Sequence, residues 1–145
     1  MKDLKIAIVV SKFNDDITSQ LLSDATNTLK KAEILDNHIL IYHVPGAFEI
    51  PFVAQVVSEK KEVDAIICLG SVIRGETTHY DYVAGECARG IMNVSLQYQI
   101  PVIMGVLTTE NRDQAQKRTF GPKGQKGIES ANAALEMITL LKKLS

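Results

Sequence analysis

The sequence predicts an α/β protein built on a parallel sheet, because short apolar runs alternate with amphipathic helical stretches. Four runs of strand length are rich in Ile and Val and are apolar on consecutive residues, at 6–10, 39–42, 65–69 and 102–107. Such runs are typical of parallel strands that are covered on both faces, so four central strands are expected. The alternation predicts right-handed crossovers and a flavodoxin-like, three-layer α/β/α sandwich around a four-stranded parallel sheet.

The predicted helices are marked by apolar residues at every third or fourth position. Asp15 or Asp16 is expected to cap the first helix, whose buried face is formed by Ile17, Leu21, Ala25, Leu29 and Ala32. Further helices are expected from Ile50 to Lys60, from about Asp81 to Tyr98, from Arg112 to Arg118 and from Gly127 to Leu144. The last one carries an apolar stripe at Ile128, Ala131, Leu135, Ile138 and Leu141.

Length and composition predict one ordinary globular domain, residues 1–145. The 145 residues are 46% hydrophobic and 23% charged, and a chain of this size needs neither disulfides nor a structural metal to close a core. The 16 Lys and Arg nearly balance the 17 Asp and Glu. Because no stretch is strongly basic, neither a nucleic-acid partner nor a membrane partner is expected.

The expected location is the cytoplasm. Cys68 and Cys87 lack the paired spacing of zinc or redox motifs, so both are interpreted as buried thiols of a reducing compartment. The first apolar run, Ile6 to Val10, is shorter than the roughly 7 to 15 residues of a signal peptide's apolar region. No segment approaches the ~20 apolar residues of a membrane span.

One candidate for proton transfer lies where ligands of such folds collect, at the carboxyl ends of the strands. His79 follows the long loop after the third strand, and Thr77 or Thr78 could cap the helix that begins there. An imidazole exchanges protons near neutral pH, and a helix N-terminus favours its neutral form. Position alone leaves open whether His79 is a catalyst or an exposed capping residue. His38 and His43 are interpreted as structural, and three His without repeated spacing do not predict a metal site.

Two aromatic residues occupy loops at the same predicted edge. Phe13 follows the first strand and Phe48 follows the second. Two rings at one opening could stack on a flat heterocycle, with Glu49 as a hydrogen-bond acceptor beside them. The alternative, held equally open, is that both rings anchor their loops to the core and that Glu49 is an N-terminal helix charge.

A cationic, glycine-rich segment, residues 118–127, precedes the last predicted helix. Arg118, Lys123 and Lys126 could bind a phosphate together with backbone N–H groups, although the composition alone favours an ordinary solvated loop. Its glycines follow a helix and are spaced GxxGxxG, unlike a Walker or Rossmann loop. GxSxG, HExxH and CxxC motifs do not occur in the sequence.

Four strings resemble the 6,7-dimethyl-8-ribityllumazine synthase family of riboflavin biosynthesis. They are SKFN at 11–14, VPGAFEIP at 44–51, GSVIRGETTHYDYV at 70–83 and GVLTTEN at 105–111. The resemblance implies a transferase that joins 5-amino-6-(D-ribitylamino)uracil to 3,4-dihydroxy-2-butanone 4-phosphate, with loss of phosphate and water. It also implies that no metal or redox cofactor is required.

The resemblance assigns roles to individual residues. His79 is the proton-transfer residue, Phe13 stacks on the pyrimidine, and Arg118 binds the phosphate. Glu76 and Thr77 match backbone positions that hold the phosphorylated ketone. Asn14 and Lys126 match polar contacts to the ribityl chain and the phosphate region. The heterocycle and ribityl chain are lined by Ala47, Phe48, Glu49, Ser71, Val72 and Ile73.

The resemblance also concerns assembly. Family members form pentamers with active sites between adjacent subunits, and some build hollow icosahedral shells from twelve pentamers; the sequence leaves the shell open. Met104 occupies a position where many members carry an aromatic residue that covers the neighbour's ligand ring, and the chain begins close to its first strand, so subunit contacts are expected to differ.

Riboflavin synthase is a candidate partner. The alternative function is a non-catalytic flavin or lumazine carrier, or a shell protein of the same fold.

Overall fold

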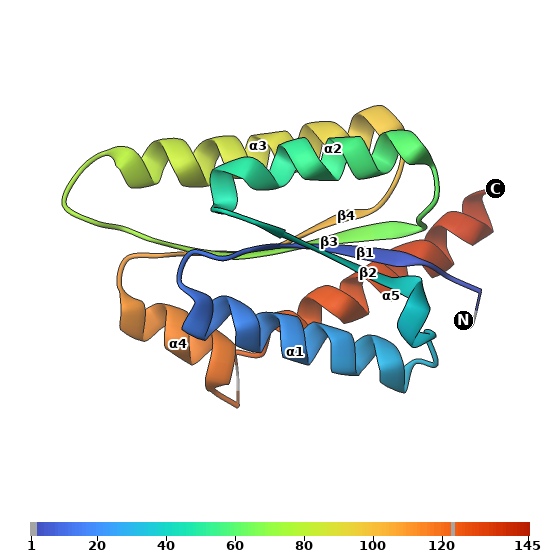
Figure 1. The fold of residues 1–145 in the computed structure, drawn as a ribbon, viewed down its shortest axis with the longest axis horizontal. Coiled ribbons are helices and arrows are strands. Elements are labelled where there is room, and N and C mark those ends of the chain that lie inside the picture. Colours follow the sequence, from blue (N-terminus) through green and yellow to red (C-terminus); the bar gives the residue numbers. More distant parts are fainter. Residues whose placement is uncertain (1–2, 123) are drawn as a thin grey trace.

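The computed structural model describes residues 3–122 and 124–145 and contains a four-stranded sheet. Its strands β1 (Ile6–Ser11), β2 (Ile39–Val44), β3 (Ala65–Ile73) and β4 (Val102–Thr109) are parallel, in the order β2-β1-β3-β4 (Figure 1). The helices are α1 (Asp15–Lys31), α2 (Ile50–Lys60), α3 (His79–Tyr98), α4 (Arg112–Phe120) and α5 (Lys126–Leu144). Short 3-10 helices span Asp36–His38 and Ala47–Glu49.

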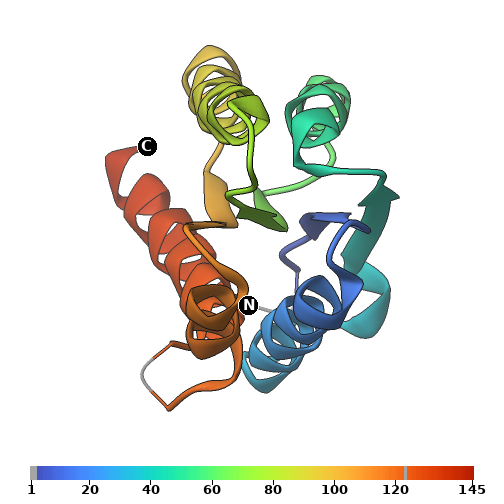
Figure 2. The same ribbon diagram turned by 90° about the vertical axis from the view of Figure 1, so that its left-hand side faces the viewer.

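Three layers are visible when the sheet is viewed from the carboxyl ends of its strands (Figure 2). α2 and α3 cover one face, and α1, α4 and α5 cover the other. Alternate residues of β1 and β3 point into two separate apolar cores, one on each face. The predicted flavodoxin-like α/β/α sandwich with a four-stranded parallel sheet is therefore confirmed.

The expectation of four central strands is wrong for two of them. β1 and β3 are central and buried almost throughout, whereas β2 and β4 form the two edges. In β2 the consecutive residues Ile41, Tyr42 and His43 are exposed. Apolar composition favours a strand with covered faces, but it does not show whether the strand has a neighbour on both sides.

The predicted helices are all present, with differences near their ends; α4, for example, continues to Phe120 instead of ending at Arg118. Neither Asp15 nor Asp16 caps α1; both lie in its first turn, after Asn14 in a left-handed conformation (φ 62°). α3 begins at His79 rather than near Asp81, so the histidine belongs to the helix itself. Thr78 precedes α3 without a side-chain capping bond. In α5 the predicted stripe ends early, because Leu141 is exposed.

Gly105 of β4 lies close to both α5 and β3. A Cβ atom there would lie 2.6 Å from Ser130 Oγ and 2.7 Å from Leu69 Cδ2. We expect Gly105→Ala to lower the free energy of unfolding by about 1–3 kcal/mol, the usual cost of overpacking a core. Urea denaturation of the two proteins at one fixed protein concentration measures this difference in the free energy of unfolding.

Gly85 provides the control because a Cβ there would meet no atom within 4 Å. It lies inside α3, where alanine forms helix better than glycine by about 1 kcal/mol. Gly85→Ala should therefore leave stability unchanged or raise it. Equal losses in the two variants would contradict the close approach at Gly105.

Cys68 and Cys87 are free and buried, as predicted. Burial raises the pKa of Cys87 from 9.0 to about 11 and also raises the pKa of Cys68. Since the native state retains protons that the unfolded state releases, the free energy of unfolding should fall as pH rises from about 9 to 11.

Both thiols should also resist a disulfide reagent such as DTNB at about pH 8 until the protein is denatured. Labelling kinetics with and without urea measure this protection. Fast labelling of native protein would contradict the burial of these thiols.

None of the helices within 3–122 and 124–145 is long and apolar enough to cross a membrane.

Candidate active site

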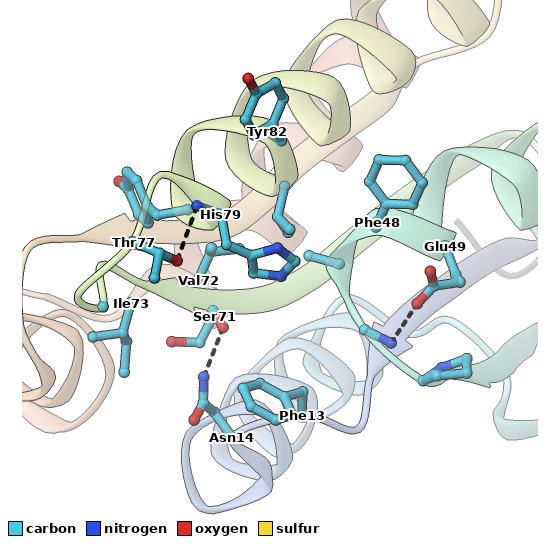
Figure 3. Close-up of a pocket in the computed structure, with 16 residues that line it drawn as sticks. Phe13, Asn14, Phe48, Glu49, Ser71, Val72, Ile73, Thr77, His79 and Tyr82 are labelled. Atoms are coloured by element: carbon cyan, nitrogen blue, oxygen red, sulfur yellow. Dashed lines mark hydrogen bonds between the residues drawn. The ribbon is translucent and has the colours of Figure 1, made fainter.

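A cavity of about 600 Å³ opens at the carboxyl ends of β1, β2 and β3 (Figure 3). We call it the strand-end cavity. It lies among the loops that follow these strands and the first turns of α3. Its lining is Phe13, Asn14, Pro45, Gly46, Ala47, Phe48, Glu49, Ser71, Val72, Ile73, Gly75, Thr77, His79, Tyr80, Tyr82 and Val83.

Main-chain hydrogen bonds join the loops after β1 and β2. The Lys12 N–H donates to Val44 O at 2.8 Å, and the Phe13 N–H donates to Pro45 O at 3.1 Å. The side chain of Asn14 extends the connection to β3, because its Nδ2 donates to Ser71 O at 2.9 Å. Three segments distant in sequence are thereby held in one fixed arrangement around the cavity.

Two aromatic rings face this cavity without being buried in the core. Phe13 is 70% exposed and Phe48 is 56% exposed, which is not expected of rings that anchor loops by packing on the interior. Beside Phe48, the Glu49 carboxylate accepts a hydrogen bond from the Gly46 N–H at 2.9 Å (Figure 3). One Glu49 oxygen is therefore held in place, and the rings are available to a flat ligand.

His79 is the first residue of α3, and its imidazole points into the middle of the strand-end cavity (Figure 3). The side chain of Thr77 fixes the start of the helix, because its Oγ1 accepts a hydrogen bond from the His79 N–H at 3.3 Å. An exposed imidazole at this position can exchange protons with a bound molecule.

Ser71 contributes a buried hydroxyl to the same cavity. The residue is 3% exposed, and among the described residues its Oγ has no hydrogen-bond partner. Because a buried hydroxyl without a partner is costly, a polar group of a ligand would be a favourable partner for Ser71.

The structure separates the predicted site residues into two groups. Phe13, Asn14, Ala47, Phe48, Glu49, Ser71, Val72, Ile73, Thr77 and His79 all line the strand-end cavity. Glu76, Met104, Arg118 and Lys126 do not.

The residues outside the lining lie in different elements. Glu76 is exposed in the loop between Gly75 and Thr77, and Met104 is half-buried in β4. Arg118 is exposed in the last turn of α4, and Lys126 begins α5. Lys123, also part of the predicted cationic segment, lies outside the described residues.

Tyr80, Tyr82 and Val83 line the cavity but were not singled out from the sequence. A helix that begins at His79 places the residues three and four positions later on the same side of its axis. Helical periodicity counted from His79 would therefore have identified Tyr82 and Val83.

Among the residues of 3–122 and 124–145, no group of three or more His, Cys, Asp or Glu is placed to hold a metal ion. The strand-end cavity is lined by the imidazole of His79, two exposed aromatic rings and the polar groups beside them.

Comparison with known families gives a match that spans nearly the whole chain. A family model described as 6,7-dimethyl-8-ribityllumazine synthase matches residues 3–142. The matched region contains every strand and the complete lining of the strand-end cavity.

Proposed function

Because the chain belongs to the 6,7-dimethyl-8-ribityllumazine synthase family, a transferase family of riboflavin biosynthesis, we propose that it forms 6,7-dimethyl-8-ribityllumazine. Its substrates are 5-amino-6-(D-ribitylamino)uracil and 3,4-dihydroxy-2-butanone 4-phosphate. The observation that carries this proposal is that His79 and two exposed aromatic rings, Phe13 and Phe48, line one cavity. The family match supports the same reaction.

The uracil substrate binds between the loops after β1 and β2. Its flat ring stacks on Phe13, and Phe48 contributes a second apolar surface. The fixed carboxylate of Glu49 accepts a hydrogen bond from a ring N–H or a hydroxyl group. The Ser71 hydroxyl and the Asn14 amide, which lie across the cavity on β3 and at the start of α1, face the ribityl chain.

The reaction consists of proton transfers between two oriented substrates. The primary amine attacks the ketone to give a carbinolamine, which loses water to form an imine. Loss of a proton and of phosphate then leaves an enol, which tautomerises to a new carbonyl group. Attack by the second amine on this carbonyl closes the ring with loss of a second water. His79 accepts and returns protons at its imidazole in these steps. Holding both substrates together supplies the larger part of the acceleration.

The phosphate is bound at the junction with a neighbouring subunit. Gly75, Glu76 and Thr77 offer backbone groups to the phosphorylated ketone from within the chain. Arg118 and Lys126, which lie outside the cavity lining, reach the site from the adjacent copy, as Met104 does to cover the ring.

We propose a homopentamer. Exposed apolar side chains on α2 and α3, including Phe52, Met92 and Leu96, support self-association. Size-exclusion chromatography with light scattering distinguishes a pentamer from a monomer and from a larger shell.

An absorbance assay with both substrates tests the proposed reaction. The purified protein should accelerate lumazine formation well above the enzyme-free rate. A carrier protein would shift the spectrum of bound lumazine without accelerating its formation, and that result would overturn the proposal. His43→Ala is a suitable control because His43 is exposed on β2 and does not line the strand-end cavity.

We further propose that residues 1–145 act as one domain and that the protein works in the cytoplasm. The first proposal is supported by the two apolar cores, which share one sheet. The two free thiols fit a reducing compartment. Riboflavin synthase, which would use the product, is the proposed functional partner.

A further inference from the structure

Arg74 lies at the entrance to the loop that leads to His79. Its backbone N–H donates to Thr109 O at 2.9 Å, which extends the pairing of β3 with β4 by one residue. The chain then crosses residues 75–78 and enters α3 at His79. Arg74 does not line the strand-end cavity, whereas Gly75, Thr77 and His79 do.

The guanidinium group of Arg74 connects both ends of this loop. Its Nε donates to Glu110 Oε2 at 2.5 Å, and its Nη1 donates to Asp81 Oδ1 at 3.3 Å. Its central carbon lies 4.4 Å from the centre of the Tyr80 ring. Glu110 directly follows β4, whereas Tyr80 and Asp81 belong to the first turn of α3.

The contact at Glu110 is itself held in place. The Glu110 N–H donates to Gln114 Oε1 at 2.8 Å, and the Gln114 N–H donates to Asn111 Oδ1 at 2.8 Å. The backbone of Glu110, whose carboxylate accepts from Arg74, is therefore held by the start of α4. An isolated exposed ion pair contributes little to stability. The planar guanidinium of Arg74, however, contacts two carboxylates and one ring, and these three contacts together fix the position of the first turn of α3 relative to Glu110.

We propose that Arg74 is a positioning residue for the reaction assigned to this site: it clamps the loop 75–78 and the first turn of α3 so that His79 and the ketone-binding backbone face the cavity. This inference rests on the proposed function. Arg74 contacts Tyr80 and Asp81, the two residues that follow His79. Loss of the clamp would therefore move the imidazole without removing it.

Steady-state kinetics of Arg74→Met test the proposal. We expect kcat/KM for the butanone phosphate to fall about 10- to 100-fold, because small displacements of reacting groups have effects of this size. Affinity for the ribitylaminouracil should change by less than about twofold, since Phe13 and Glu49 lie on other loops. Rates are expressed per heterocycle-binding site, so that loss of folded protein does not appear as loss of kcat.

Arg89→Met is the matched control. Arg89 lies in α3, the helix that begins at His79, is 69% exposed and pairs with Glu86 at 3.4 Å, without lining the cavity. Kinetic constants of Arg74→Met equal to those of Arg89→Met would overturn the proposal. So would an equal loss of affinity for both substrates, because that would indicate general damage to the fold.

A measurement independent of turnover reports the position of His79 directly. Diethyl pyrocarbonate modifies accessible imidazoles, and peptide mass spectrometry gives the rate at His79 relative to the exposed His43. The ratio should change at least about threefold in Arg74→Met, because local opening alters accessibility, and should stay constant in Arg89→Met. If the wild-type protein formed no lumazine, the proposed function would fail, and this ratio would still decide whether Arg74 positions His79.

Glu110→Gln provides a second, milder variant in case Arg74→Met does not fold. It keeps the shape of the side chain and removes the charge that Arg74 contacts. The double variant should be no slower than Arg74→Met alone, because both changes break one interaction. The proposal would be wrong if the losses of kcat/KM in the two single variants multiplied in the double variant. It would also be wrong if Glu110→Gln kept wild-type kinetics and the wild-type modification ratio.

Discussion

Replacing His79 with alanine should lower kcat for lumazine formation by about 100- to 10,000-fold, the range expected for loss of a general acid–base group. The imidazole points into the centre of the strand-end cavity. Binding of the ribitylaminouracil should change little, because the rings and the carboxylate that receive it lie on other loops. Initial rates and equilibrium binding of the heterocycle, measured on the same preparation, separate the two effects.

The pH dependence provides an independent check on His79. Because His79 is proposed to accept and return protons, wild-type kcat should depend on pH, and the residual activity of His79→Ala should lose that dependence. The same pH profile in the wild-type protein and in His79→Ala would contradict a proton-transfer role for His79.

Replacing Arg118 with glutamine should raise the KM for the butanone phosphate about 10- to 100-fold, because hydrogen bonds to a charged group contribute about 1.5–3 kcal/mol each. Arg118 has no ion-pair partner among the described residues, whereas the neighbouring Lys117 pairs with Asp113 at 3.1 Å. Lys117→Gln removes the same charge from the same helix and should leave the KM nearly unchanged. An unaltered KM in Arg118→Gln would contradict the proposal that Arg118 binds the phosphate.

Mixed assemblies test which subunit supplies Arg118. His79→Ala chains retain Arg118, and Arg118→Gln chains retain His79. If each pocket takes its arginine from a neighbour, co-expression of the two variants should restore intact pairs at about one interface in four. If one chain supplied both residues, every site would keep a defect and no activity would return.

The alternation of apolar runs and helical periodicity was enough to predict the layers of the fold, because both patterns report which faces are covered. The same patterns did not place β2 at an edge, since its Ile and Tyr residues resemble those of a buried strand although Ile41 and Tyr42 are exposed. Strand order depends on long-range pairing, which local composition does not contain.

For the site, too, local sequence patterns identified some residues, whereas residues that depend on long-range packing were missed. The carboxyl-end rule and the loop residues placed Phe13, Phe48 and His79 at one edge of the sheet, and all three line one cavity. Tyr82 was missed because the start of α3 was expected two residues too late. Arg74 was not singled out because its contacts with Glu110 and Asp81 depend on packing between segments distant in sequence.

The hydrogen bonds from Lys12, Phe13 and Asn14 to the carboxyl ends of β2 and β3 and to the loop after β2 have a further consequence for the rate of ligand capture. A receptor surface that is already ordered loses little conformational entropy when it is occupied, and its association needs no slow rearrangement. The heterocycle should therefore bind in a single bimolecular step, with an observed rate that increases linearly with its concentration.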